Sequence, residues 1–465
     1  MITLENRFFP LRSAVCFFVE GGIILVSVLA SFYILQSGGV DGTTLKHHDA
    51  FLRGAVVAFF CQTCMYLLDM YDLKISQSWG ELFFSLLFAV GFVCIGIGCV
   101  TYVVPELGVE GKMYYLTILF VAAFLMLWRI AFDLYLTRVA PKESILIIGT
   151  GRLARTVGDE VRRSERLGFQ LAGYVDGGAG NTVRDVVGDD VIGSYADLQD
   201  IVRRKGIRKV VVAINERRGG YPVEDLLNLR VKGCQVLEWS DFFEKLSGTI
   251  AIDNLAPSYF IFQEGFRKSR FLLYSRRIVS LLVSFFLLVP LLPILLVVAV
   301  LIKLDSPGPV FYTQDRVGIG GRFFRIMKFR SMRQDAEGES GPRWASKNDP
   351  RITRFGKFLR KSRLDEVPQL FNVLKGDLNL VGPRPERPVF VEELTKAIPY
   401  YSIRHTVRPG LTGWAQVMFM YCGTLEESKE KLQYDLFYIK NMSVKLDLLI
   451  LFKTIKIVLL GRGAR

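Results

Sequence analysis

The first 140 residues are dominated by long apolar runs with short polar connections between them. The runs lie near residues 13–36, 50–71, 81–104 and 113–136. Each is long enough to cross about 30 Å of hydrocarbon as a helix, so the pattern predicts a bundle of four transmembrane helices over residues 1–140. Arg7 and Arg12 precede the first run, and Arg138 and Lys142 follow the last. Because basic residues favour the cytoplasmic side, we expect both ends of the bundle to lie there.

The pattern changes at Pro141, where short apolar runs begin to alternate with helical stretches. The predicted elements, in chain order, are a strand at 144–149, a glycine turn into a helix at 149–154, a strand at 171–176, a helix at 196–205, a strand at 209–214 and a helix at 223–232. Strands that alternate with helices in this way favour a parallel sheet covered by helices. The pattern therefore predicts a Rossmann-like α/β domain over residues 141–255.

The glycine turn of this domain has two interpretations. In the first, Gly149 and Gly151 let a nucleotide pyrophosphate approach the helix N-terminus, and Asp176 reaches a ribose. In the second, the glycines serve only tight packing between strand and helix. Redox chemistry of the short-chain dehydratase type needs a tyrosine with a lysine four residues later, and none of the 18 tyrosines has one. The glycine signal alone leaves nucleotide binding open.

A fifth apolar run, residues 278–301, is long enough to span a membrane but has two unusual features. Pro290 and Pro293 lie near its middle, where each removes a backbone donor and favours a bend. Basic residues flank the run on both sides, including Arg276, Arg277 and Lys303. Positive flanks at both ends favour one side of the membrane, so we expect a re-entrant helical hairpin rather than a simple span.

Composition supports a membrane protein with an anionic partner. Hydrophobic residues make up 51% of the chain, and this content excludes disordered and collagen-like classes. The formal charge is +14, and residues 302–465 hold 29 Lys and Arg against 17 Asp and Glu, a local excess of 12. No nucleic-acid-binding module is recognisable, so the basic excess does not predict a nucleic-acid partner. A membrane surface or a phosphorylated substrate fits the charge better.

An adjacent acidic pair, Asp365 and Glu366, stands just before Pro368. Proline is favoured in the first turn of a helix, so the pair is expected at or just before a helix N-terminus. Adjacent carboxylates there could divide the roles of nucleophile and metal ligand, because Mg²⁺ prefers one or two carboxylates together with phosphate oxygens. The alternative is a structural helix cap.

Cations near the acidic pair favour the chemical interpretation. Those that we expect to bind substrate phosphate are Arg360, Arg384, Lys328 and Arg330. Arginine forks clamp phosphate through two parallel hydrogen bonds. Arg384 stands between Pro383 and Pro385, whose fixed φ angles limit the entropy lost when its side chain is held.

Three dense motifs carry a family resemblance. They are KLDSPGPVFYTQDRVG from 303 with KFRSM at 328–332, FLRKSRLDEVPQLFNVLKGDLNLVGPRPE at 358–386, and RPGLTGWAQV at 408–417. Over residues 275–465 the sequence resembles the bacterial polyprenyl-phosphate sugar-1-phosphate transferases, the monotopic phosphoglycosyl transferases that initiate exopolysaccharide or O-antigen units. The bundle and the Rossmann-like domain resemble the long members of that family.

This resemblance implies a fold, a reaction and a location. It implies a mainly α catalytic domain at 256–465, with the re-entrant helix at 278–301, on the cytoplasmic side of the bacterial inner membrane. Asp365 would attack the β-phosphorus of a UDP-sugar and release UMP, and undecaprenyl phosphate would then accept the sugar phosphate. By the same resemblance Glu366 holds Mg²⁺, and Arg360 and Arg384 bind phosphate. A homodimer is compatible with the family, and the sugar is not identifiable from the sequence.

Two other classes of function compete with this interpretation. One is a non-catalytic membrane scaffold or regulator whose transferase domain has decayed, and retention of the acidic pair and its cations argues against it. The other is a membrane sugar-nucleotide-modifying enzyme that acts through the Rossmann-like domain, which the missing Tyr and Lys pair disfavours. Near the C-terminus, residues 446–460 are apolar with interspersed Lys453 and Lys456. This segment is predicted to be an interfacial helix on anionic lipid.

Overall fold

The computed structural model describes residues 11–37, 47–72, 79–103, 111–177, 190–214, 222–255, 257–334, 349–419 and 424–461. Arg7, one of the basic residues used to orient the bundle, lies outside these ranges. The chain forms two compact units, Met1–Ser247 and Gly248–Arg465. The first contains the apolar bundle and the Rossmann-like domain, and the second contains the acidic pair.

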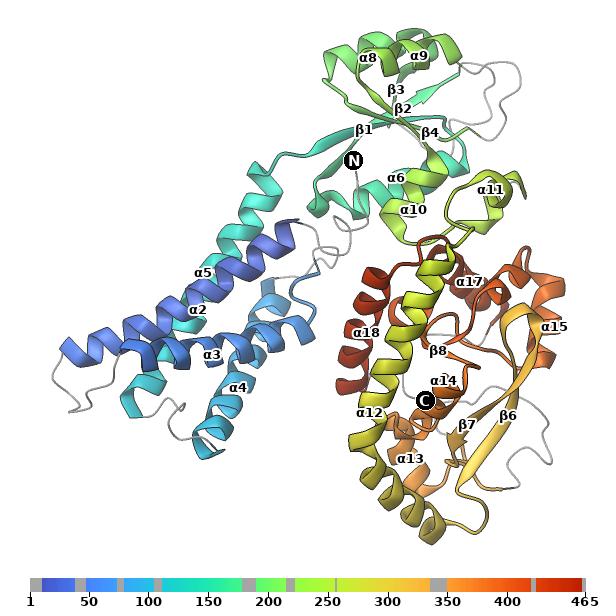
Figure 1. Ribbon diagram of the computed structural model, residues 1–465. Helices are drawn as coiled ribbons and strands as arrows, with labels where there is room; N and C mark the ends of the chain where they lie inside the picture. The colour runs from blue at the N-terminus through green and yellow to red at the C-terminus, as the bar shows by residue number, and fades with distance from the viewer. Residues whose placement is uncertain are drawn as a thin grey trace. The chain divides into compact units, whose positions relative to one another are not determined.

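All four helices predicted for the N-terminal bundle form. They are α2 (Leu11–Ser37), α3 (His47–Leu67), α4 (Trp79–Val103) and α5 (Gly111–Leu134), the last continued by a π-helical turn, Tyr135–Val139. Helix α2 packs against α3 and α5, and α4 packs against both of those (Figure 1). Inside the bundle Glu20 is fully buried and pairs with Arg129 at 2.6 Å. An acidic residue within an apolar helix can indicate a functional site, but the ion pair with Arg129 is a sufficient structural reason for Glu20.

The Rossmann-like domain is a five-stranded parallel sheet with helices on both faces. Its strands are β1 (Glu143–Ile148), β2 (Phe169–Asp176), β3 (Val191–Ser194), β4 (Lys209–Val212) and β5 (Gln235–Glu238), in the order β3-β2-β1-β4-β5. Its helices are α6 (Arg152–Arg163), α8 (Leu198–Arg204), α9 (Val223–Val231) and α10 (Trp239–Ser247). Helices α6 and α10 pack together on one face, and α8 and α9 on the other (Figure 1). The predicted fold is confirmed, with two short strands, β3 and β5, that the sequence pattern did not reveal.

The second unit is mainly helical around two small sheets. Its helices are α11 (Pro257–Phe262), α12 (Arg270–Asp305), α13 (Arg354–Lys361), α14 (Gln369–Lys375), α15 (Pro388–Ala397), α16 (Trp414–Met418), α17 (Leu425–Lys440) and α18 (Val444–Leu459). Strands β6 (Phe311–Val317) and β7 (Phe323–Phe329) form an antiparallel hairpin, and β8 (Asn379–Val381) pairs with β9 (Gly410–Thr412) in parallel. The 3-10 turns used below are η8 (Leu364–Glu366) and η9 (Tyr401–Thr406).

The boundary between the units falls at Ser247, eight residues before the expected end of the Rossmann-like domain at 255. Long-range hydrogen bonds explain the difference. The Trp414 indole donates to the Gly248 carbonyl at 2.9 Å, and the Ile250 amide donates to the Gln433 carbonyl at 3.1 Å. Residues 248–255 therefore belong to the second unit, a connection that local sequence patterns do not indicate.

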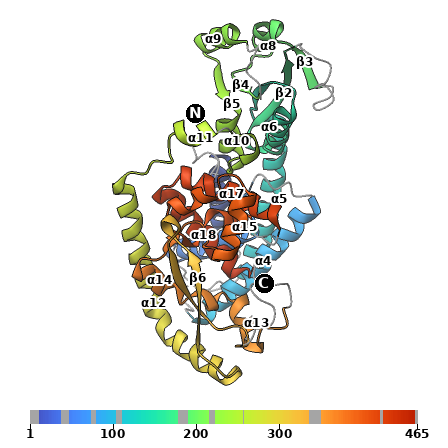
Figure 2. The same cartoon turned by 90° about the vertical axis from the view of Figure 1, so that its right-hand side faces the viewer.

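The segment predicted as re-entrant, residues 278–301, contains no chain-reversing turn, and its course in a membrane stays a prediction. The whole segment lies in one helix, α12, which includes both Pro290 and Pro293. The helix is bent in both views (Figures 1 and 2). Each proline removes one backbone donor, which is enough to bend a helix, but no glycine, asparagine or aspartate is present to reverse the chain.

Helix α12 packs along its length against the rest of its unit. A single stripe of its residues is buried: Arg276, Ser280, Ser284, Leu288, Leu295, Val298 and Ile302. Near its start, Arg277 donates to the Val373 carbonyl at 2.7 Å, and past its end Arg330 donates to the Ser306 carbonyl at 2.6 Å. Large apolar side chains between these points remain exposed on its other faces, such as Phe286 at 69%. Such an exposed apolar surface is unusual on a water-soluble protein, whereas contact with lipid would bury it favourably.

The helix predicted at residues 446–460 also forms, as α18. Its exposed apolar residues, Leu448, Phe452, Ile455 and Leu459, repeat every three or four positions and so share one face. Leu446 and Ile450 on the opposite face are buried, and α18 packs against α12. The amphipathic arrangement agrees with a helix that lies at a lipid interface.

Candidate active site

A tight connection between α13 and α14 positions the acidic pair. Thr353 caps α13 by accepting a hydrogen bond from the Gly356 amide at 3.0 Å. After the helix, Arg363 adopts a left-handed conformation with φ of 59°, and the chain enters the 3-10 turn η8. Pro368 then precedes α14, as its position in the sequence predicted. Asp365 and Glu366 thus lie just before a helix N-terminus.

Glu366 lies between two cations from different parts of the unit. Its Oε1 accepts hydrogen bonds from Lys328 Nζ of β7 at 2.8 Å and from Arg384 Nη2 at 2.5 Å. Burial would raise the pKa of this carboxyl, but Arg384 and Lys328 outweigh burial and hold the pKa well below its ordinary value. Glu366 is therefore ionised throughout the physiological range.

Asp365 has a different environment although it is the next residue. Its Oδ1 is buried and has no hydrogen-bond partner among the described residues. Burial, together with the charge of Glu366, raises the pKa of Asp365 to about 6. An unpartnered buried carboxylate oxygen is costly for a fold, so it indicates a position where a ligand completes the bonding. Perturbed titration next to cations is typical of functional sites.

The predicted phosphate-binding cations divide into two groups. Lys328 and Arg384 contact Glu366, and Arg360 donates through Nε to Ser331 at 2.9 Å while its charge acts on Asp365. Burial lowers the pKa of Lys328 and of Arg360. These three residues surround the acidic pair as predicted.

Arg330 belongs to the second group, because its hydrogen bonds go to backbone carbonyl groups near the end of α12. Its guanidinium donates to the Ser306 and Pro307 carbonyls at 2.6 and 2.7 Å, immediately after α12. It thereby satisfies backbone acceptors at the end of that helix. The residue is buried, and these contacts connect the segment just after β7 to the end of α12, so a phosphate role for Arg330 stays a prediction.

The acidic pair offers oxygen atoms that suit a divalent cation. Among the described residues no group of three or more His, Cys, Asp or Glu side chains could hold a metal alone. Asp365 Oδ1 is unpartnered, and Glu366 Oε2 has one weak contact, with Arg384 Nη1 at 3.5 Å. One or two carboxylate oxygens are what Mg²⁺ takes when phosphate oxygens supply other positions, so the residues fit the predicted metal.

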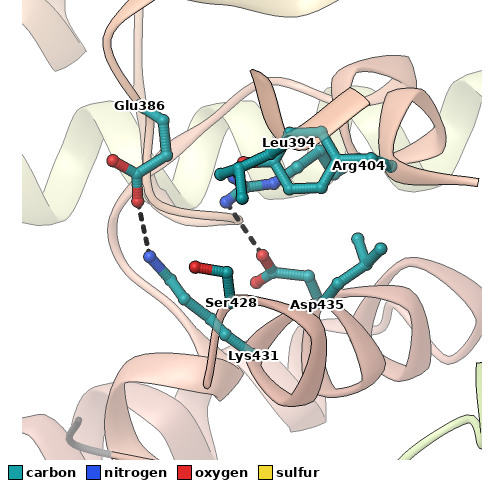
Figure 3. Close-up of a pocket in the computed structure, with 8 residues that line it drawn as sticks. Glu386, Leu394, Arg404, Ser428, Lys431 and Asp435 are labelled. Carbon is teal, nitrogen blue, oxygen red and sulfur yellow. Dashed lines mark hydrogen bonds and ion pairs between the residues drawn. The ribbon is translucent and has the colours of Figure 1, made fainter. Parts of the chain in front are cut away.

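Next to the segment that carries Arg384 is a buried ionic cluster that the sequence analysis did not identify. Its members are Glu386, Arg404, Lys431 and Asp435. Lys431 points toward Glu386, and Asp435 points toward Arg404 (Figure 3). The two ion pairs measure 2.6 and 2.9 Å. Lys431 and Asp435 are four residues apart on α17, a spacing that places them on one helix face. This spacing is a sequence signal for a charged face on α17, but the local sequence does not indicate which residues that face contacts.

In the Rossmann-like domain the glycine turn has a packing explanation. Gly149 has φ of 116°, and a Cβ there would lie 2.5 Å from the Ala213 carbonyl oxygen. At Gly151 a Cβ would meet nothing within 4 Å. Asp176 does lie beside this turn, where its Oδ1 accepts from the Gly177 amide at 2.7 Å and from the Thr150 hydroxyl at 3.3 Å. The turn brings the predicted residues together, and nucleotide binding stays a prediction.

Comparison with known proteins identifies the class. Residues 271–461 match the family described as bacterial sugar transferase, and residues 66–236 match a family described as CoA-binding domain. The relative in Rhizobium leguminosarum bv. phaseoli named exopolysaccharide production protein PSS is 42% identical over 39% of this chain and 94% of its own. The chain belongs to the bacterial sugar transferase family.

Other relatives carry more specific names. The Aeromonas hydrophila UDP-N-acetylgalactosamine-undecaprenyl-phosphate N-acetylgalactosaminephosphotransferase is 46% identical over 48% of this chain, and the match spans about half of that relative, 52%. The Komagataeibacter xylinus undecaprenyl-phosphate glucose phosphotransferase is 32% identical over 78% of this chain and 67% of its own. These relatives differ in the sugar that they name.

Proposed function

We propose that this protein transfers a sugar 1-phosphate from a UDP-sugar to undecaprenyl phosphate and releases UMP, the first membrane step of exopolysaccharide or O-antigen synthesis. The observation that carries the proposal is the buried, unpartnered Oδ1 of Asp365 beside the paired Glu366, Lys328 and Arg384. A nucleophile must be free to form a new bond, and nearby cations must receive the phosphate charge. The family membership and the names of the relatives support the same substrates.

The residues suggest a two-step exchange. An Asp365 carboxylate oxygen attacks the β-phosphorus, the bond from that phosphorus to the bridging oxygen breaks, and UMP leaves with the bridging oxygen. An oxygen of the lipid phosphate then attacks the same phosphorus, and Asp365 is released. A pKa of about 6 leaves Asp365 about nine-tenths ionised near pH 7, so it is a nucleophile without a separate base.

Cations of the site would hold the reacting phosphates. Arg384 and Lys328 already form charge-assisted hydrogen bonds with Glu366, and Arg360 adds a further positive charge near Asp365. Glu366 would hold Mg²⁺, which would supply charge neutralisation to the diphosphate when bound. The role of Glu366 is then to place its ionised carboxylate between metal and cations.

Both ends of α12 are inferred to lie on the cytoplasmic side, where UDP-sugars are supplied. Contacts of Arg277 and Arg330 attach the start and end of α12 to the same compact unit. Its exposed apolar faces, with those of α18, would lie in the inner leaflet and bring the acidic pair to the depth of a lipid phosphate.

The function is tested with the full chain in vesicles that contain undecaprenyl phosphate. A panel of UDP-sugars is screened for UMP release, and an acid quench in the absence of lipid phosphate is expected to trap labelled sugar phosphate on Asp365. The absence of UMP release with every UDP-sugar would contradict the proposal. Transfer without any trapped intermediate, in which label passes straight to lipid, would remove only the two-step mechanism.

The location of α12 is tested by labelling single cysteines with an impermeant reagent. Arg276 is buried against Asp447, so the exposed Arg270 and Lys303 are the better positions. In a variant without native cysteines, R270C and K303C are each expected to stay unlabelled in intact cells and to react after permeabilisation. Labelling of only one position in intact cells would indicate a span and would refute the cytoplasmic assignment.

A further inference from the structure

The segment that carries Arg384 is held by its carbonyl groups. The carbonyls of residues 383 to 386 each accept a hydrogen bond, and the donors come from three parts of the unit: β6, η9 and β9. The donors are, in order, Gly410 N, Arg404 Nη2, Arg316 Nη1 and Val317 N, at 2.9, 2.8, 3.1 and 3.0 Å. The residues flanking Arg384 are prolines, which have no amide hydrogen, so the segment cannot be held by an ordinary ladder of amide donors.

The bond to the Arg384 carbonyl comes from a side chain that is itself fixed. The Arg404 guanidinium also donates to Asp435 Oδ2 at 2.9 Å and to the Tyr401 hydroxyl at 2.6 Å, and it lies 5.1 Å from the Tyr401 ring centre. Arg404 and Asp435 are both buried. Several bonds in fixed directions leave the guanidinium little freedom to move.

A second contact joins the same segment to α17. Lys431, one turn before Asp435, pairs with Glu386 at 2.6 Å, two residues after Arg384 (Figure 3). Glu386, Arg404, Lys431 and Asp435 line one small cavity, and these four charged groups are paired with one another. The cavity offers no unsatisfied charge to a ligand among the described residues, so a structural effect on Arg384 explains these contacts better than a second binding site does.

We propose that Arg404, held by Asp435 and Tyr401, is a positioning residue that fixes the Arg384 carbonyl and so directs the Arg384 side chain onto Glu366. Its consequence for turnover rests on the proposed function, whereas its effect on the order of the segment does not. Lysine at position 404 would keep the charge opposite Asp435 but could not bond in a fixed fork to three groups.

Hydrogen exchange tests the ordering directly. In the full chain in detergent, Arg404→Lys is expected to speed exchange of the amides of Val317, Gly382 and Gly410, whose hydrogen bonds hold the segment, by at least about tenfold, because the segment opens locally. The matched control is Lys429→Gln, on the same helix but paired with Asp253. Asp435→Asn provides a second variant with a smaller expected effect if Arg404→Lys folds poorly. Unchanged exchange in both position-404 and position-435 variants would overturn the proposal.

A double-mutant cycle on UMP release tests the route through Arg384. Arg404→Lys is expected to lower kcat about tenfold or more with little change in KM, and Arg384→Lys to lower it further. The double variant should be no slower than Arg384→Lys alone, because the partner that Arg404 positions is already altered. Losses that multiply would show that Arg404 acts independently. If the wild-type chain releases no UMP, the proposed function fails, and hydrogen exchange still decides the ordering role.

Discussion

The sequence predicts functional residues at two turns, the glycine turn before α6 and the acidic turn before α14. The two turns differ in whether their polar side chains have hydrogen-bond partners. In the glycine turn before α6, Asp176 receives hydrogen bonds from its own neighbours, Gly177 and Thr150. In the acidic turn before α14, Glu366 is paired across the unit, and Asp365 Oδ1 is buried with no partner among the described residues.

This difference distinguishes a residue that packing explains from a residue that indicates a binding or catalytic role. A close approach to the Ala213 carbonyl explains why residue 149 is glycine, and no ligand is needed for that explanation. No packing argument explains a buried carboxylate oxygen without a partner, because burial of a charge costs free energy unless something binds it. An incomplete set of polar contacts is therefore a stronger sign of function here than a glycine motif.

Replacement of the unpartnered carboxylate should have the largest effect. Asp365→Asn is nearly isosteric but cannot form an acyl phosphate, so we expect UMP release to fall by about 1000-fold or more. Thermal unfolding should be unchanged or improved, because a buried charge is removed. Asp315→Asn, at an exposed pair with Arg325, is the control. Turnover within tenfold of the wild type would remove Asp365 as the nucleophile.

Glu366→Gln should have a smaller effect that also appears in metal dependence. We expect about a 100-fold loss of kcat and a weaker apparent Mg²⁺ affinity, because the amide lacks the charge that a metal and two cations require. The measurement is UMP release over a Mg²⁺ titration. An unchanged Mg²⁺ midpoint would assign Glu366 to the alignment of Arg384 and Lys328 alone.

In the glycine turn, substitution should affect stability rather than turnover. Gly149→Ala combines a positive φ with a close contact, so we expect a loss of about 2 kcal/mol in the free energy of unfolding. Gly151→Ala meets open space and is the matched control. UMP release per folded molecule should stay within about twofold in both. A large loss of turnover in folded Gly149→Ala would give this turn a part in the reaction.

The last prediction concerns the pH dependence of stability and no change in turnover. Burial, with the nearby charge of Arg404, lowers the pKa of His405 to about 4. In the unfolded chain the value is about 6.5, so the unfolded chain binds a proton that the folded chain excludes as pH falls from 6.5 to 4. Stability should fall over that range by about 2 kcal/mol, after allowance for the partial exposure of His405. Unfolding at several pH values should show a shallower slope in His405→Gln, and an equal slope would refute this assignment.

Sequence patterns predicted the local features of both turns well. The strand before Gly149, the acid at the end of β2 and the position of Pro368 before α14 all follow from short-range preferences. The cations around Asp365 were predicted from their chemistry and nearness in the motifs, and three of the four lie at the site.

Features that depend on distant partners were not predictable. Arg330 and Arg384 are both arginines, but the Arg330 guanidinium donates to a carbonyl group just past the end of α12. Arg404 acts on a carbonyl twenty residues earlier, and no local pattern encodes that contact. A chain-reversing turn was expected within α12, but the segment stays helical, because proline signals a bend without specifying its extent.

The exposed apolar surface of α12 has a consequence for how the protein is retained at the bilayer. A chain that began at Gly248 would lack the four-helix bundle but would still carry this surface and that of α18. The two units would then attach to lipid independently, and the linkage between them keeps each at high effective concentration when the other is bound. Loss of the bundle should leave the acidic pair at the membrane, and detergent would still be needed to extract it.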